Sequence, residues 1–158
     1  MSEAKLGIYK VKHLAERPVV KQIPDNYKEL DVYSLFLLGY SNRIQFKSAI
    51  HINKLLDLNQ HLNTLHVRYI LLIHFLSRYK ALIKSTTQKE IERSDYPRRN
   101  SKLLIICADL TRCGLIVCEA KMYKGKEVKN YSVSDLGYKA INIIRDIIQE
   151  TCLTQPSN

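Results

Sequence analysis

The stretch from residue 98 to residue 137 constrains the fold most, because a helical pattern, a sharp stop and two strand-like runs follow one another directly. Apolar residues at helical spacing predict one buried stripe: Leu103, Ile106, Cys107 and Leu110. Gly114 follows, at a place where a helix end favours a left-handed backbone. The runs 115–123 and 128–133 are joined by Lys124-Gly125-Lys126, and a short linker that contains glycine predicts a β-hairpin.

A further amphipathic helix is expected after the hairpin, from Ser134 to about Cys152. Ser134 or Asp135 can cap its start. Isoleucines recur every three or four residues along this segment and give it a wide apolar face. In a small domain that face needs a partner, which either an earlier helix of the chain or a second subunit can supply.

Two helical regions are expected upstream. Residues 33–58 predict one long helix, or two helices joined near residues 40–42. Thr64 is expected to cap the next helix, over residues 66–83, whose dense apolar run predicts burial on most sides.

A short helix is expected next. Thr87, followed three residues later by Glu90, fits a capping box at its start, and the helix is expected to end near Ser94. Residues 95–97 then form a turn, because Pro97 lacks an N–H and pushes its predecessor out of the helical region.

These elements, in this order, resemble the winged helix-turn-helix regulators, most of all the MarR family. The family's Gly-Leu-Ile step into the first wing strand is matched at residues 114–116. Its aromatic-x-hydrophobic-Thr-x-x-Gly segment is matched at residues 131–137, with Ser134 in place of Thr. A Thr-Gln-x-Glu start of the short helix is matched at residues 87–90, and the resemblance covers residues 33–150.

The resemblance implies a mainly α fold with a small β-hairpin wing, that is, a winged helix-turn-helix with N- and C-terminal dimerisation helices. Residues 1–30 are expected to form a basic, flexible arm, and residues 31–158 a single winged-helix DNA-binding domain. The arm is interpreted as a solvated tail in preference to a segment that contacts DNA or a second subunit. The implied function is sequence-specific binding of double-stranded DNA as a homodimeric transcriptional regulator.

The third helix is expected to start near residues 98–101 and to run to Arg112. Its first residues are the candidates for base contacts: Arg98, Arg99, Asn100, Ser101 and Lys102. The turn before this helix is longer than in the family, so base-reading positions are not assigned one to one. Ile105, one turn further on, is a candidate for contact with a thymine methyl group, whereas Asp109 would be repelled by phosphate.

Phosphate contacts are expected from two further places. Thr87 and Gln88, at the start of the preceding helix, are candidates because helix N-termini bind anions. The lysines of the wing are candidates for neighbouring phosphates or the minor groove: Lys121, Lys124, Lys126 and Lys129. The alternative interpretation is that these cations only keep an exposed hairpin soluble.

Composition supports DNA binding without locating it. The chain has 158 residues, a formal net charge of +10 and a sequence pI near 9.5, which favours polyanionic partners. The excess of basic over acidic residues is spread along the chain. Residues 84–131 hold 11 Lys/Arg against 6 Asp/Glu, and residues 1–83 hold 12 Lys/Arg against 6 Asp/Glu. With no apolar leader or membrane-length run, we expect no membrane association and a cytoplasmic location.

No motif points to an enzyme, a cofactor or a metal site. His66 and His74 share a helix face without a matching Cys or carboxylate and are interpreted as structural. The cysteines are interpreted as inert thiols in preference to redox switches, and a small-molecule effector stays unidentified. The alternative functions are a winged-helix accessory protein of plasmid or mobile-element replication or transfer, and a winged-helix module for protein interaction.

Overall fold

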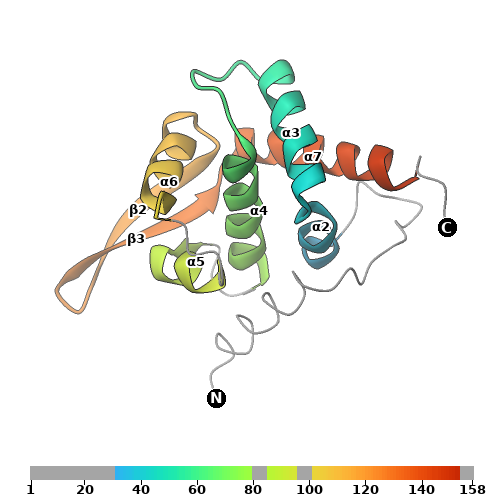
Figure 1. Cartoon of the computed structure of the whole chain (residues 1–158). Coiled ribbons are helices and arrows are strands. Elements are labelled where there is room, and N and C mark those ends of the chain that lie inside the picture. The colour runs from blue at the N-terminus through green and yellow to red at the C-terminus, as the bar shows by residue number, and fades with distance from the viewer. Residues whose placement is uncertain (1–30, 80–84, 96–100, 154–158) are drawn as a thin grey trace.

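The computed structural model describes residues 31–79, 85–95 and 101–153 (Figure 1). Within these ranges the helices are α2 Val32–Gly39, α3 Asn42–Leu55, α4 Thr64–Tyr79, α5 Gln88–Ser94, α6 Leu103–Arg112 and α7 Asp135–Leu153. The strands are β1 Thr86–Thr87, β2 Ile116–Tyr123 and β3 Lys126–Val133. The expected mainly helical fold with a small β-hairpin is therefore confirmed. The proposed arm at residues 1–30 lies outside the described residues.

Two helices, rather than one long helix, occupy residues 32–55. Asp31 caps α2 by accepting a hydrogen bond from the Ser34 N–H at 2.6 Å. Ser41 caps α3 in the same way, accepting from the Ile44 N–H at 3.2 Å. The extended backbone of Ser41 separates the two helices, as one of the two sequence interpretations predicted.

Helix α4 is the centre of the fold. It packs against α2 and α3 on one side, and against α5, α6 and β3 on the other (Figure 1). Its residues from Val67 to Leu76 are all buried, which confirms the expected burial on most sides. The prediction that Thr64 caps this helix is wrong. Asn63 is the capping residue, because its Oδ1 accepts from the N–H groups of Leu65 at 3.0 Å and His66 at 3.2 Å.

Helix α7 is covered by the chain itself. Its buried isoleucines line the side that faces α2 and α3: Ile141, Ile144, Ile147 and Ile148. Ser134 caps the helix, since its Oγ accepts from the Gly137 N–H at 3.0 Å. Within the described ranges, no helix is both long and apolar enough to cross a membrane.

The strands form one antiparallel sheet in the order β1-β3-β2. The β2–β3 register runs from Ile116 opposite Val133 to Tyr123 opposite Lys126. Lys124 and Gly125 both have positive φ, 50° and 77°, which is the conformation of a two-residue hairpin turn. Strand β3 therefore begins at Lys126 instead of Val128, because the tight turn lets pairing continue to the last residue.

Two glycines fix the path of the chain around this sheet. Gly114 ends α6 with a φ of +78°, as expected from the sequence. Gly137, on the first turn of α7, lies so close to the start of the sheet that an added Cβ would be 2.1 Å from the Leu115 carbonyl oxygen. This contact explains why a glycine is needed at the end of segment 131–137.

Candidate nucleic-acid interface

Thr87 caps the start of α5, as the capping-box pattern predicted. Thr87 has extended backbone angles, and its hydroxyl oxygen accepts from the Glu90 N–H at 3.3 Å. The Glu90 carboxylate accepts from the Thr86 hydroxyl at 3.1 Å, which fastens β1 to the helix. Gln88 is half-buried and donates to the Glu92 carboxylate at 3.1 Å. Phosphate contacts by Thr87 and Gln88 stay predictions.

The end of α5 is held by a buried carboxylate. Asp95 is 1% exposed and accepts from the Arg68 guanidinium, with Nε at 2.9 Å and Nη2 at 2.5 Å. Its second oxygen accepts from the Tyr69 hydroxyl at 2.5 Å. Burial, and then the hydrogen bond to Asp95, raises the pKa of Tyr69 far above its usual range. The contact ties α5 to α4 just before the turn.

Helix α6 begins later than predicted. Its first residue is Leu103, and Lys102 occupies the capping position without a side-chain capping bond. Ser101 and Lys102 lie in the preceding turn and are exposed. Leu103 is the first residue of the buried apolar stripe, so packing against α4 sets where the helix begins. The other candidates, residues 98–100, lie outside the described residues.

The two faces of α6 differ sharply. The predicted stripe is confirmed, since its members are at most 4% exposed: Leu103, Ile106, Cys107 and Leu110. The outer face consists of exposed residues: Leu104, Ile105, Ala108, Thr111 and Arg112. Leu104 and Ile105 are 53% and 60% exposed. The first two turns of this face are therefore apolar.

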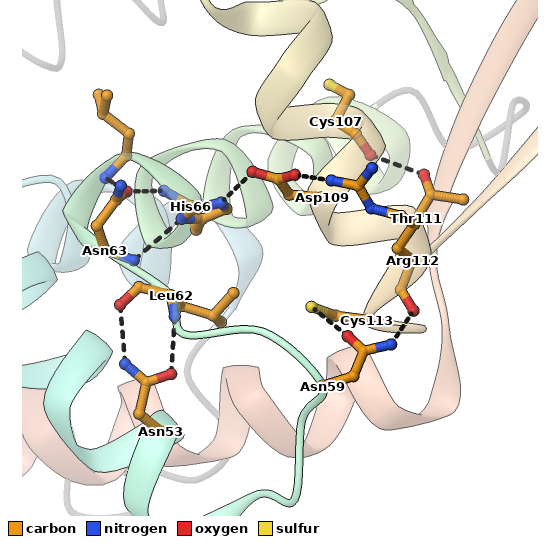
Figure 2. A network of polar contacts seen from close by, with 11 residues as sticks. Asn53, Asn59, Leu62, Asn63, His66, Cys107, Asp109, Thr111, Arg112 and Cys113 are labelled. Atoms are coloured by element: carbon orange, nitrogen blue, oxygen red, sulfur yellow. Dashed lines mark hydrogen bonds and ion pairs between the residues drawn. The ribbon is translucent and has the colours of Figure 1, made fainter.

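Asp109, the acidic residue of α6, is buried in a polar network (Figure 2). Its Oδ2 accepts from His66 Nε2 at 3.0 Å. The Nδ1 atom of His66 accepts from the Asn63 N–H at 3.0 Å, so Nε2 is the nitrogen that carries the proton. Arg112 donates to the other carboxylate oxygen of Asp109. His66 is thus structural, as predicted.

The network also shifts the pKa of Asp109 and holds α6 to the loop before α4. Burial alone would raise the pKa of the Asp109 carboxyl, but hydrogen bonds from His66 and Gln60 and the charge of Arg112 lower it on balance. Asn59 donates to the Arg112 carbonyl oxygen at 3.3 Å, which adds a second tie (Figure 2). The second half of α6 is therefore fixed to the loop before α4, and its carboxylate is withdrawn from the surface.

The strand register places the lysines of the β2–β3 ribbon on different faces. Lys121 is opposite Val128, and Tyr123 is opposite Lys126, so Lys121 and Lys126 share one face of the ribbon with Tyr123. Lys129 is opposite Ala120 and lies on the other face. All of these lysines are exposed.

The tip of the ribbon combines cationic and apolar groups. Lys124 is in the turn, with its Nζ atom 5.4 Å from the centre of the Tyr123 ring. Met122 and Tyr123 are 71% and 64% exposed. Sequence reasoning did not single out these two side chains, although their place next to the turn was a signal for exposure.

The thiols of Cys107 and Cys113 are buried. Burial raises the pKa of the Cys107 thiol to about 12, and it also raises the pKa of the Cys113 thiol. Among the residues that the structure describes, no three His, Cys, Asp or Glu side chains gather closely enough to hold a metal ion.

Comparisons of the chain with protein-family models, curated proteins and solved structures found no match. The function is therefore inferred from the chemistry of the surface that α6 and the β2–β3 ribbon form. The outer face of the helix is apolar in its first two turns. The ribbon carries four exposed lysines and two exposed glutamates, Glu119 and Glu127, and the Glu119 carboxylate lies 4.0 Å from Lys121 Nζ.

Proposed function

We propose that the chain is a winged helix-turn-helix protein that binds double-stranded DNA in a sequence-specific manner, as a dimeric, MarR-like transcriptional regulator. One observation carries the proposal. The outer face of α6 presents no carboxylate, and α6 lies on the same side of the molecule as the lysine-bearing β2–β3 ribbon (Figure 1). A helix and a basic ribbon side by side fit the major groove and the adjacent backbone of a duplex.

The order of the elements supports this assignment. Helix α4 is followed by β1, α5, α6 and the β2–β3 hairpin, and both α5 and α6 pack against α4. In this interpretation α6 is the recognition helix and the hairpin is the wing. The buried contacts of Asp95 and Asp109 hold α5 and α6 to α4 and to the loop before it, which makes the surface rigid before DNA arrives.

The cations then divide by position. Lys121 and Lys126, on one face of the ribbon, and Lys124 at its tip are proposed to contact phosphates on one side of the wing. Lys129 lies on the opposite face and is proposed to make a separate contact or none. Lys102, in the turn before α6, is proposed to contact the backbone at the edge of the groove.

The dimer part of the proposal rests on α3. Phe46 and Ile50 lie one turn apart on its outer side and are 60% and 45% exposed. They border an open pocket of about 310 Å³ that Asn53 and His61 also line. Exposed aromatic and aliphatic side chains on one helix face support an interface between two copies of the chain.

The test is selection of DNA by the native chain from a random-sequence duplex pool. The proposal predicts enrichment of a palindrome, because a symmetric dimer presents two copies of α6. The Lys121→Ala/Lys126→Ala variant is expected to bind the enriched duplex more weakly. The matched Arg78→Ala/Lys139→Ala variant removes two exposed cations from α4 and α7, away from the ribbon and from the outer face of α3, and should bind like the native chain. A pool that stays unselected would contradict the proposal.

A protein-interaction module is the second candidate function. The apolar outer face of α6, with Leu104 and Ile105 largely exposed, favours it, because such a face also suits contact with another protein. A native chain that binds no duplex at any salt concentration, and that associates with itself through this face, would support this second function.

A further inference from the structure

We propose that α6 recognises the 5-methyl groups of thymine through an apolar patch formed by Leu104, Ile105 and Ala108. This inference rests on the proposed binding of duplex DNA and names what the helix reads there. It predicts that the preferred site is rich in A·T pairs at the positions that face α6. Recognition would then occur by apolar contact more than by hydrogen bonds.

The patch has the position that such contact requires. Leu104 and Ile105 are the second and third residues of α6, and Ala108 is exposed one turn later on the same face. In helix-turn-helix docking, the first residues of the recognition helix are those that face the base edges. Leu104 and Ile105 are 53% and 60% exposed, so their side chains extend into solvent and can reach a groove.

The polar groups of α6 are poorly placed for base contacts in this region. Thr111 and Arg112 lie in the last turn, away from the start of the helix. The Thr111 hydroxyl donates to the Cys107 carbonyl oxygen at 2.7 Å, and the Arg112 guanidinium pairs with Asp109. Because the thymine methyl is the apolar group that base pairs present in the major groove, it is the feature that this patch can select.

The charges around the patch favour a polyanion over another protein surface. The Asp109 carboxylate of α6 is turned inward and is held by His66. Lys102 lies immediately before the helix, and the β2–β3 ribbon, which carries four exposed lysines against two exposed glutamates, lies on the same side of the molecule as α6 (Figure 1). An apolar patch bordered by cations, without an exposed carboxylate on its own helix, complements a methyl-lined groove between two phosphate backbones.

The test compares two forms of one DNA. A duplex pool that the native chain has enriched is re-amplified with thymine or with uracil, which lacks only the 5-methyl group. Burial of one methyl group corresponds to about a fourfold change in affinity, so two contacts predict that uracil weakens binding about 15-fold. The Leu104→Gln/Ile105→Gln variant should bind both forms alike. The Leu55→Gln variant, altered at a 66% exposed residue of α3, should keep the native preference.

Each outcome decides the inference. Equal, tight binding of both pools by the native chain would overturn methyl recognition and leave the proposed function standing. Failure of the native chain to enrich any duplex would overturn both. If the Leu104→Gln/Ile105→Gln variant, with an unchanged circular dichroism spectrum, loses self-association in sedimentation and keeps its thymine preference, the patch is a protein contact and the inference is wrong.

Discussion

Asp95 and Asp109 are buried carboxylates that join the short helices α5 and α6 to the rest of the domain. Asp95 accepts from Arg68 and Tyr69 of α4, and Asp109 accepts from His66 at the start of α4. Apolar packing is not directional, whereas hydrogen bonds to these carboxylates fix the orientation of α5 and α6 relative to α4. The candidate interface therefore depends on residues that do not contact DNA in the proposal.

Replacing Asp95 with alanine is expected to destabilise the protein by about 3–5 kcal/mol, because Arg68 is left buried without its partner. Urea denaturation followed by circular dichroism measures this change. The Asp146→Ala variant removes an exposed carboxylate of α7 and should change stability by about 0.5 kcal/mol or less. Similar losses in the two variants would show that the Asp95–Arg68 pair contributes little.

His74 makes stability depend on pH. Burial, with the nearby charges of Arg145 and Arg78, lowers its pKa to about 4. Between pH 6.5 and 4 the unfolded chain therefore binds a proton that the folded chain does not, and stability falls as pH falls, by at most about 1.4 kcal/mol per pH unit. Above pH 6.5 this contribution is constant.

The His74→Leu variant should show a flatter stability profile over that pH window. Within the described part of the chain, neither ring nitrogen of His74 has a hydrogen-bond partner, so the substitution leaves no polar group newly unpaired. Denaturation curves at pH 7, 6, 5 and about 4 for the two chains provide the measurement. Parallel profiles would mean that His74 does not titrate in this way.

At the level of elements, local chemistry determined what could be predicted. The capping residue Thr87, the stop at Gly114 and the hairpin between residues 115 and 133 depend on nearby residues, and all were predicted. The start of α6 was not predicted, because the packing of Leu103 against α4 sets it. The cap of α4 was assigned to Thr64 instead of Asn63 because both residue types cap helices and the two are adjacent. The division between α2 and α3 was left open because the apolar pattern of the two helices continues across it.

Among the glycines that the structure describes, Gly137 is expected to tolerate substitution least. Its alanine variant would place a methyl group against the Leu115 carbonyl oxygen and the Val133 side chain. The resulting displacement of α7 from the sheet should cost about 3 kcal/mol in unfolding free energy, measured by urea denaturation. Gly125 has open space around it, so Gly125→Asn, which accepts positive φ, should stay within about 1 kcal/mol of the native chain. Equal effects would contradict the close approach at Gly137.

At the level of the whole molecule, the sequence predicted where the α6 helix and the β2–β3 ribbon lie along the chain, but not which side chains share a face. The lysines of the β2–β3 ribbon are exposed cations, as predicted, yet only the strand register separates Lys129 from Lys121 and Lys126. Among the residues of the apolar patch, only Ile105 was singled out from the sequence. The burial of Asp109, which leaves the patch without a carboxylate, depends on His66, a residue distant in the sequence.

The proposed dimer makes a separate prediction. Sedimentation velocity of the native chain at micromolar concentration should show a dimer, and the Phe46→Glu/Ile50→Glu variant should sediment as a monomer, because charged groups would be buried at the α3 interface. An unchanged far-ultraviolet circular dichroism spectrum confirms that the variant is folded. A variant that remains dimeric would locate the interface elsewhere, and a monomeric native chain would contradict the dimer.

The central claim, that the β2–β3 ribbon and α6 bind duplex DNA together, is tested most directly by salt dependence. Affinity for the enriched duplex is measured over a series of salt concentrations for the native, Lys121→Ala/Lys126→Ala and Arg78→Ala/Lys139→Ala chains. Each lost phosphate contact lowers the slope of log affinity against log salt by about 0.9. The ribbon variant of a dimer lacks four such contacts, two from each protomer, so we predict a slope lower by about 3.6. The slope for the Arg78→Ala/Lys139→Ala variant should be unchanged. Identical slopes for all three chains would contradict the claim.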